Sequence, residues 1–288
     1  MVVDRPTGPV TAPPVTVWVD LERTDSGEGV RRIQGRGLQG LTWGIRHAVH
    51  RMRYPGIRCV TYGTEPDQWA DLYVPETRRH ADGRDGAQEP WTTTGTGLPV
   101  VALIHGGYWR SIWAADLMEP LCADLLGRGF AVWNIEYRRP DLHGWNATTA
   151  DIATALSTLH DPGATGGMGL DLSRVAVVGH SAGGQLALRA AADGALVSLA
   201  VSLAGVLDLE AGDRRWLSAG AVAAALGHPS LGRPPGPARA DRYAESSPLR
   251  RVPLGVPQLI VQGGRGRSGP GRLLPSLRRG GQGGGGTT

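Results

Sequence analysis

The chain has 288 residues, of which 41% are hydrophobic, enough for one large α/β domain with a substantial core but too few for two full domains. Its formal net charge of +4 is unevenly distributed, because residues 246–288 hold seven arginines and no acid. Residues 1–245 hold 23 arginines against 26 acidic residues, so the body of the chain is not basic. This balance argues against a nucleic-acid partner.

The two cysteines, Cys59 and Cys122, are too few for a framework of disulfide bridges, which predicts a reduced, cytoplasmic location. The N-terminus lacks a basic start followed by an apolar core, and no window approaches roughly 18 apolar residues. We therefore expect no membrane partner. The sequence contains no metal-ligand cluster and no nucleotide-binding fingerprint, so it predicts neither a metal nor a cofactor.

The first part of the chain predicts little regular structure. Residues 1–40 mix Pro, Gly, Thr and Arg, so we expect a loosely ordered arm in which only residues 15–19 are strand-like. Residues 41–54 are consistent with a short helix. Two alternating stretches, 57–62 and 69–74, flank a turn that contains Gly, Pro and Asp, which is the pattern of an antiparallel strand pair. We expect this pair at the leading edge of the sheet.

From residue 99 onward, buried-type strands alternate with helical patterns. Strands are expected at 99–104, 130–135, 175–178, 196–204 and 256–261, and helices at 113–128, 148–160, 185–191 and 216–226. This alternation predicts an α/β fold with a doubly wound, mostly parallel sheet covered by helices on both faces. Glycine makes up eleven of the last 26 residues, so we expect the domain to span residues 41–262 and residues 263–288 to form a disordered, Gly/Arg-rich tail.

One stretch carries a motif for nucleophilic catalysis. The apolar run Val-Ala-Val-Val at 175–178 stops at Gly-His-Ser-Ala-Gly, residues 179–183, and an Ala-rich helical segment follows. A strand that enters a sharp turn and then a helix lifts one side chain clear of the sheet, and glycines on either side allow the backbones to pass closely. The pattern predicts Ser181 as the nucleophile; the alternative is a tight turn that carries an incidental serine.

A second motif, His-Gly-Gly-Tyr-Trp-Arg at 105–110, directly follows the first strand of the alternating series. Consecutive glycines after a strand can direct backbone N–H groups at the oxygen of an attacked carbonyl. We therefore predict an oxyanion hole made by Gly106, Gly107 and the N–H of Ala182. The alternative is a plain glycine turn after a strand.

The two motifs together, H-G-G-Y-W-R followed by G-H-S-A-G-G, resemble the α/β-hydrolase superfamily, and the Tyr-Trp after the glycines is most similar to its kynurenine formamidase (arylformamidase) and related esterase branch. The similarity covers roughly residues 62–262 and includes residues 61–75 and Asn-Ile-Glu-Tyr-Arg at 134–138. It implies an α/β-hydrolase fold and a serine hydrolase of carboxylic esters or of aryl formamides of the N-formylkynurenine type. The implied partner is a small-molecule substrate, and no cofactor is implied.

The resemblance fails at the C-terminal end of the domain. In this superfamily the acid of the triad typically follows the strand expected here at 256–261, and the histidine comes one strand later. Residues 246–288 contain no Asp, Glu or His, so we expect a sheet that is incomplete at its C-terminal edge and a lost or frameshifted C-terminus. The alternative function is a catalytically dead hydrolase-fold binding protein, or a truncated gene product that lacks the triad Asp and His.

Four further residues are candidates for the site. Asp208 follows a strand on the side of the sheet where ligands bind and is the candidate acid, the alternative being an aspartate that caps a helix or turn. His228 is the candidate base, the alternative being a solvated loop histidine. Tyr108 and Trp109 are candidates for substrate binding in a pocket for an aromatic group, although core positions fit them as well. The oligomeric state is left open.

Overall fold

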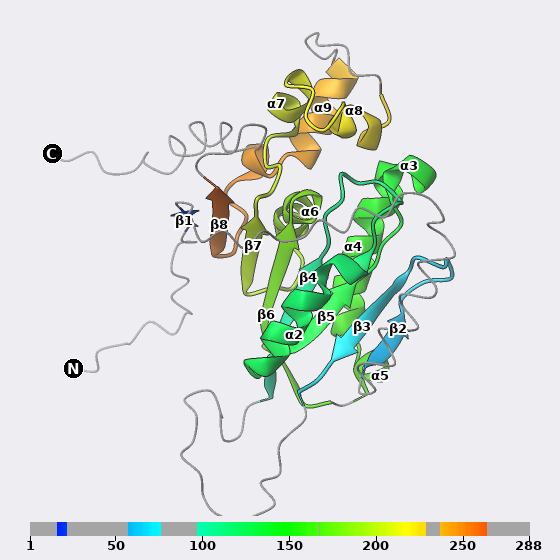
Figure 1. The fold of residues 1–288 in the computed structure, drawn as a ribbon, viewed down its shortest axis with the longest axis vertical. Helices are drawn as coiled ribbons and strands as arrows, with labels where there is room; N and C mark the ends of the chain where they lie inside the picture. The colour runs from blue at the N-terminus through cyan, green and yellow to red at the C-terminus, as the bar shows by residue number, and fades with distance from the viewer. Residues whose placement is uncertain (1–15, 22–56, 76–96, 167, 229–236, 264–288) are drawn as a thin grey trace, which may run out of the picture.

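The computed structural model describes residues 16–21, 57–75, 97–166, 168–228 and 237–263. The strands are β1 (Thr16–Leu21), β2 (Arg58–Thr61), β3 (Trp69–Tyr73), β4 (Leu98–Ile104), β5 (Ala131–Ile135), β6 (Leu170–His180), β7 (Leu199–Leu203) and β8 (Gln258–Gly263). Within the described residues they form one eight-stranded sheet in the order β1-β8-β7-β6-β4-β5-β3-β2 (Figure 1). β3 is antiparallel to both β2 and β5, whereas the other neighbouring strands are parallel. The predicted α/β fold with a mostly parallel sheet is confirmed.

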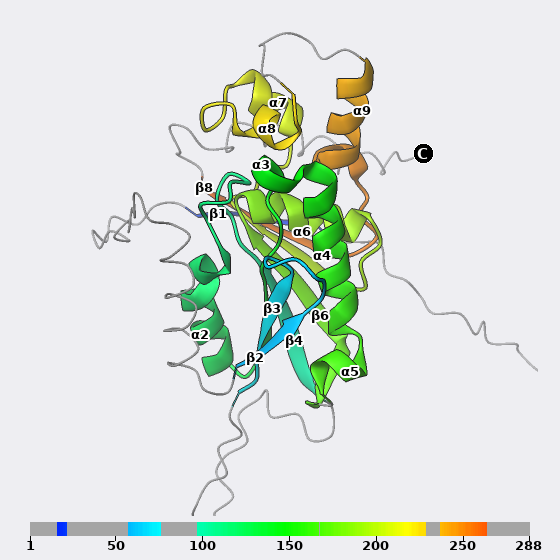
Figure 2. The ribbon, with the colours of Figure 1, turned by 90° about the vertical axis from the view of Figure 1, so that its right-hand side faces the viewer.

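Helices cover both faces of this sheet, which is the doubly wound arrangement. The helical segments of the described residues are η1 (Ala115–Met118), α2 (Glu119–Gly127), α3 (Pro140–His143), α4 (Trp145–Leu159), α5 (Pro162–Thr165), α6 (Ala182–Ala192), α7 (Leu209–Arg214), α8 (Ala221–Ala225), α9 (Pro237–Ser246) and η2 (Pro248–Arg251). Figure 2 shows α2 on one face and α4 and α6 on the other. The central strand β4 ends in five consecutive buried residues, because helices cover both of its faces.

The contact of α4 with the sheet follows from its sequence. Ile152, Ala155, Leu156 and Leu159 recur at helical spacing and form one apolar face, and each is at most 3% exposed. Trp133 of β5 is fully buried beneath this face, and its indole N–H donates to the Ala155 carbonyl at 3.0 Å. Packing and one hydrogen bond thus fix α4 against the middle of the sheet.

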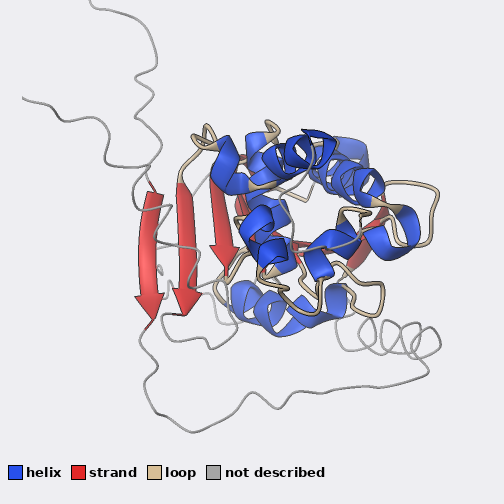
Figure 3. Cartoon of the chain, turned by 90° about the horizontal axis from the view of Figure 1, so that it is seen from above, coloured by secondary structure: helices blue, strands red, loops and turns tan. Residues whose placement is uncertain are grey.

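One edge of the sheet agrees with the prediction from the sequence, and the other does not. The antiparallel pair expected at 57–62 and 69–74 is present as β2 and β3. At the other edge β1 lies parallel to β8, in register from Thr16 opposite Gln258 to Leu21 opposite Gly263. Figure 3 shows the strands at this edge extending beyond the helices. A strand from the N-terminal segment thus covers the edge that the sequence predicts to be open, which corrects the expectation of an incomplete sheet.

The helices α7, α8 and α9 gather beyond the ends of β6, β7 and β8 (Figures 1 and 2). The sequence predicts one helix at 216–226, but only α8 forms there. Trp216, Ser218, Ala219 and Gly220 have φ angles of 53°, 50°, 57° and 76°, which a right-handed helix does not allow. The helical prediction for the first half of this stretch is therefore wrong.

Several predicted segments lie outside the described residues: the helix at 41–54, most of the arm at 1–40 and the tail after residue 263. The predicted helix at 113–128 corresponds to η1 and α2, and the one at 148–160 corresponds to α4. In the part of the chain that the structure describes, no helix is long and apolar enough to cross a membrane.

Candidate active site

Ser181 lies at the sharp turn between β6 and α6. Its backbone has φ 53° and ψ −114°, and its N–H donates to the Leu203 carbonyl at 2.8 Å. A residue with a Cβ pays a conformational cost in this region, so the surrounding structure must hold the turn. Ser181 occupies the N-cap position of α6, yet its hydroxyl makes no capping hydrogen bond. The hydroxyl is therefore not used to stabilise the helix, as an ordinary N-cap serine would be.

Glycines around Ser181 allow the turn to pack closely. A Cβ at Gly179 would lie 2.0 Å from the Gly183 carbonyl oxygen, and a Cβ at Gly183 would lie 2.1 Å from the Ile104 carbonyl oxygen. Neither position has room for a side chain, since non-bonded carbon and oxygen atoms do not approach so closely. The G-x-S-x-G spacing thus serves backbone contact between β6, α6 and the end of β4.

The segment from His105 to Arg110, here called the glycine loop, lies directly against this turn. A Cβ at Gly106 would lie 2.6 Å from the His180 carbonyl oxygen and 3.1 Å from Cβ of Ser181. Among the described residues, no acceptor takes the N–H groups of Gly106, Gly107 or Ala182. Ala182 is also the first residue of α6, where the helix dipole favours negative charge. The structure thus brings the predicted oxyanion donors and Ser181 together.

His105 determines how one peptide of the glycine loop is oriented. Its Nδ1 lies 2.7 Å from the Gly106 carbonyl oxygen, which accepts a hydrogen bond from it. The Gly106–Gly107 peptide is trans, since the one cis bond in the described residues is at Val252–Pro253. In a trans peptide the carbonyl and the following N–H point in opposite directions, so the Gly107 N–H points away from the imidazole.

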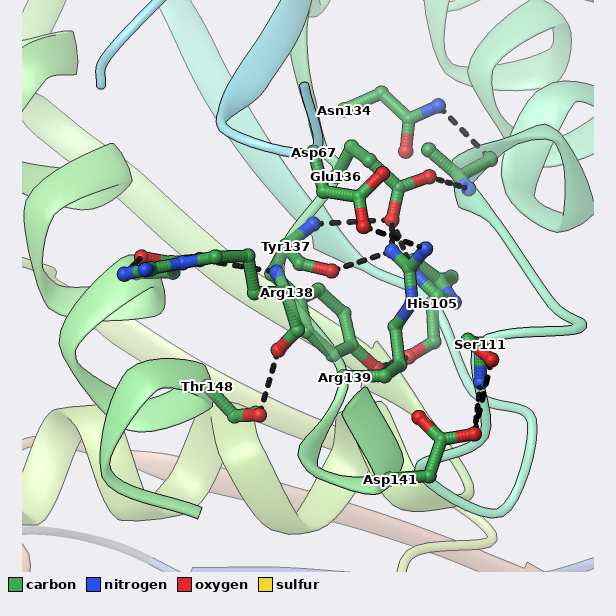
Figure 4. A network of polar contacts seen from close by, with 12 residues as sticks. Asp67, His105, Ser111, Asn134, Glu136, Tyr137, Arg138, Arg139, Asp141 and Thr148 are labelled. Atoms are coloured by element: carbon green, nitrogen blue, oxygen red, sulfur yellow. Dashed lines mark hydrogen bonds and ion pairs between the residues drawn. The ribbon is translucent and has the colours of Figure 1, made fainter. Parts of the chain in front are cut away.

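Glu136 holds His105 from the other side, as Figure 4 shows. Both side chains are fully buried. Burial alone would raise the pKa of Glu136, but the charges of His105 and Arg139, together with hydrogen bonds, hold that pKa below its usual value. The carboxylate accepts from His105 Nε2 at 3.2 Å, the Tyr137 N–H at 3.0 Å, the Ala115 N–H at 2.9 Å and the Arg139 guanidinium.

The two aromatic candidates of the glycine loop occupy different environments. Tyr108 is 44% exposed and directly follows the candidate oxyanion donor Gly107 in the chain. Trp109 is 2% exposed, and its indole N–H donates to Gln185 at 3.2 Å. The structure therefore places Trp109 in the core, which corrects its assignment to a substrate-binding surface.

Asp208 and His228 have other partners. Asp208 is the N-cap of α7, and its Oδ1 accepts from the Ala211 N–H at 2.9 Å. The His228 ring lies edge-on to the Tyr243 ring, with centroids 5.4 Å apart. Within the described ranges no hydrogen bond joins the Ser181 hydroxyl to another residue. The structure thus gives Asp208 a capping role and joins neither candidate to the hydroxyl.

Glu136 and Gln185 are not among the site residues predicted from the sequence. Glu136 follows the apolar strand β5 directly, and a charged residue at that position was a usable signal. Gln185 is one of two polar residues that follow the glycines of α6, the other being Arg189. Its partners lie 61 and 76 residues away in sequence, and no periodic pattern marks such pairs.

Two other features of the described residues bear on the site. No group of three or more His, Cys, Asp and Glu residues is arranged there to hold a metal ion. A cavity of about 250 Å³ lies between α4 and α6 and is lined by Ile152, Leu156 and Arg189, among others. Arg189 is two turns along α6 from Ser181, so we do not count this cavity as part of the candidate site.

Comparison with protein families finds a match that includes Ser181 and the glycine loop. Residues 88–223 match the family model described as BD-FAE. No curated protein matches the chain. Among solved structures, a candidate thioesterase from Silicibacter sp. TM1040 has a TM-score of 0.56 at 20% identity, over 86% of this chain and 81% of its own.

Two esterases of known structure are similar to the chain as well. A bacterial heroin esterase has a TM-score of 0.55 at 22% identity, over 77% of this chain and 71% of its own. Esterase B from Lactobacillus rhamnosis has a TM-score of 0.52 at 21% identity, over 77% of this chain and 72% of its own. These likenesses establish that the chain has the α/β-hydrolase fold.

Proposed function

We propose that the chain is a serine hydrolase of carboxylic esters or aryl formamides, with Ser181 as its nucleophile. One observation carries the proposal: Ser181 is held at φ 53° and ψ −114° without a capping bond, against a glycine loop whose Gly106 and Gly107 N–H groups meet no acceptor among the described residues. Strain of this kind at a strand-to-helix turn is typical of a functional residue. The esterases of similar fold support the reaction class.

The proposed reaction forms and breaks one acyl bond at Ser181. Its Oγ bonds to the substrate carbonyl carbon while the hydroxyl proton passes to a base, and the carbonyl oxygen becomes negative between the N–H groups of Gly106, Gly107 and Ala182. The bond to the leaving alcohol or amine then breaks as the base returns the proton. Water attacks the acyl-serine by the same route and releases the acid.

The proposal assigns the base to His228 and the acid to Asp208. Capping of α7 uses Oδ1 of Asp208, which leaves Oδ2 able to accept from an imidazole. Asp208→Asn separates the two roles, because asparagine caps a helix nearly as well but carries no charge. If these residues act as assigned, Asp208→Asn and His228→Ala lower kcat by several orders of magnitude. Unchanged rates in both variants exclude the assignment.

The substrate we propose has a small acyl group and an aromatic leaving group. Tyr108 supports this choice, because an exposed aromatic ring beside the oxyanion donors can pack against an aryl group. The test compares kcat/KM for N-formylkynurenine and for p-nitrophenyl acetate. A preference for the ester by several orders of magnitude makes the chain a general esterase and excludes the formamide.

The nucleophile is tested with a fluorophosphonate probe. We expect the probe to label Ser181 in the wild-type protein and not in Ser181→Ala, with peptide mapping to locate the adduct. Labelling of another serine that persists in Ser181→Ala contradicts the proposal.

A second candidate function is ligand binding by a hydrolase fold without turnover. It rests on the absence of Asp, Glu and His from residues 246–288. Calorimetric binding of aryl esters or formamides with no release of product supports it. Multiple turnovers that depend on Ser181 exclude it.

A further inference from the structure

Gln185 joins three elements around the proposed site through buried hydrogen bonds. It lies four residues after Ser181 on α6 and is fully buried. Its Oε1 accepts from the Trp109 indole N–H at 3.2 Å, and its Nε2 donates to the Ser246 carbonyl at 2.8 Å. Because the indole N–H only donates and the carbonyl only accepts, one orientation of the amide satisfies both partners.

The Trp109 end of this arrangement holds a strained part of the glycine loop. Gly107, Tyr108 and Trp109 have consecutive φ angles of 119°, 58° and 55°. A left-handed φ at Tyr or Trp persists only where the surroundings hold it. The Trp109 ring is buried and packs edge-on against Trp145, with centroids 6.2 Å apart. The indole therefore anchors the loop directly after its two glycines.

The Ser246 end ties the same residues to the helices beyond the sheet. Ser246 is the last residue of α9, where helix carbonyls have no partner within the helix. Gln185 satisfies the Ser246 carbonyl, and the Trp145 indole N–H donates to its Oγ at 2.9 Å. Ser246 is 1% exposed, so water cannot readily replace these bonds. The end of α9, the helix α6 and the glycine loop are thus one connected unit.

We infer that Gln185 is a positioning residue that acts through Trp109, an inference that rests on the proposed function. It holds the glycine loop so that the N–H groups of Gly106 and Gly107 remain directed at the oxygen of the substrate carbonyl. Misplacement of such donors by about 1 Å costs on the order of 100-fold in rate. The loss falls on kcat more than on KM, because the donors interact most strongly with the transition state.

The test compares two tryptophan-to-phenylalanine variants. Trp109→Phe removes the bond to Gln185, and Trp133→Phe removes a similar buried bond, the one from β5 to the Ala155 carbonyl on α4. Gln185→Met removes both amide bonds at similar side-chain length. The measurement is the rate at which a fluorophosphonate labels Ser181. In that reaction Oγ bonds to phosphorus, fluoride leaves and the hydroxyl proton passes to the base.

We expect Trp109→Phe and Gln185→Met to slow labelling about 10- to 100-fold and to lower kcat by a similar factor, with KM within about twofold. Trp133→Phe should lower the thermal midpoint but keep the labelling rate within about twofold of wild type. An unchanged rate in Trp109→Phe, or an equal loss in Trp133→Phe, overturns the inference.

A second readout separates this inference from the proposed function. Hydrogen exchange in the peptide that contains residues 105–110 should be faster in Trp109→Phe and Gln185→Met than in wild type, and unchanged in Trp133→Phe. If the wild-type protein is not labelled, the proposed function fails, and the exchange data alone decide whether Gln185 positions the glycine loop. Unchanged exchange in the glycine loop then overturns the positioning role.

Discussion

The carboxylate of Glu136 lies 3.2 Å from the imidazole of His105, and neither side chain is exposed. Arg139 donates to the same carboxylate. If Glu136 loses its negative charge, the buried positive charge of Arg139 is less well compensated. Removing one member of a buried ionic pair costs about 3–5 kcal/mol. Because His105 also donates to the Gly106 carbonyl within the glycine loop, this pair links the stability of the fold to the proposed chemistry at Ser181.

Glu136→Gln is therefore expected to lower the free energy of unfolding by about 3 kcal/mol and to slow labelling of Ser181. The matched control is Asp124→Asn, which removes the charge from an exposed pair with Arg128, where the side chains are 52% and 65% exposed. That change should have little effect on the free energy of unfolding, because solvent screens an exposed ion pair. Urea unfolding of both variants measures the difference, and equal costs contradict the prediction.

The same pair predicts how stability depends on pH. Burial opposes the ionised form of Glu136, but His105 and Arg139 outweigh it and lower the pKa of the folded state. A lowered pKa adds stability above the unfolded value of about 4.3, and this stability is lost as the pH falls through the folded value. Urea unfolding between pH 6 and pH 3 should show a steeper loss in wild type than in Glu136→Gln. Parallel curves contradict the assignment.

Ser181→Gly is expected to be more stable than Ser181→Ala. Both variants remove the hydroxyl, but alanine keeps a Cβ at φ 53° and ψ −114°, whereas glycine adopts these angles without strain. Relief of strain outweighs the greater flexibility of glycine in the unfolded chain, and we expect a net gain of about 1 kcal/mol. Thermal unfolding of the two variants decides the point. A glycine variant no more stable than the alanine variant argues against strain at the turn.

Gly106→Ala is expected to destabilise the chain and slow labelling of Ser181. The added Cβ would lie 2.6 Å from the His180 carbonyl oxygen, so the glycine loop must move away from the turn. Gly127→Ala is the control, because a Cβ at that position of α2 meets nothing within 4 Å. The control should be neutral or more stable by up to about 1 kcal/mol. Normal labelling in Gly106→Ala would show that the loop tolerates displacement.

The elements that the sequence predicts well are those whose residues carry a local signal. The strands β4 and β6 are aliphatic runs that end at glycine motifs, and both form as expected. The turn at Ser181 follows because only glycine fits at Gly179 and Gly183. In these cases the signal lies in residues that are adjacent in the sequence.

The features that the sequence does not predict depend on distant contacts. β1 and β8 pair across almost the whole chain, and no local pattern specifies that partner. The bond from Gln185 to Ser246 spans 61 residues. Residues 216–226 are expected from the sequence to form one helix, yet the positive φ angles of Trp216, Ser218, Ala219 and Gly220 exclude a helix over the first half. In the first two cases the partner is set by the tertiary structure and not by neighbouring residues.

The pairing of β1 with β8 leads to the last prediction. Two truncations isolate the contribution of this strand: removal of residues 1–15 leaves β1 intact, and removal of residues 1–21 deletes it. A backbone hydrogen bond contributes about 0.5–1.5 kcal/mol, so loss of the β1 ladder should cost about 2–3 kcal/mol beyond the shorter truncation. The longer truncation also exposes the edge of β8, which should promote association as concentration rises. Urea midpoints and light scattering measure both effects, and identical behaviour of the two truncated chains would show that β1 does not protect this edge.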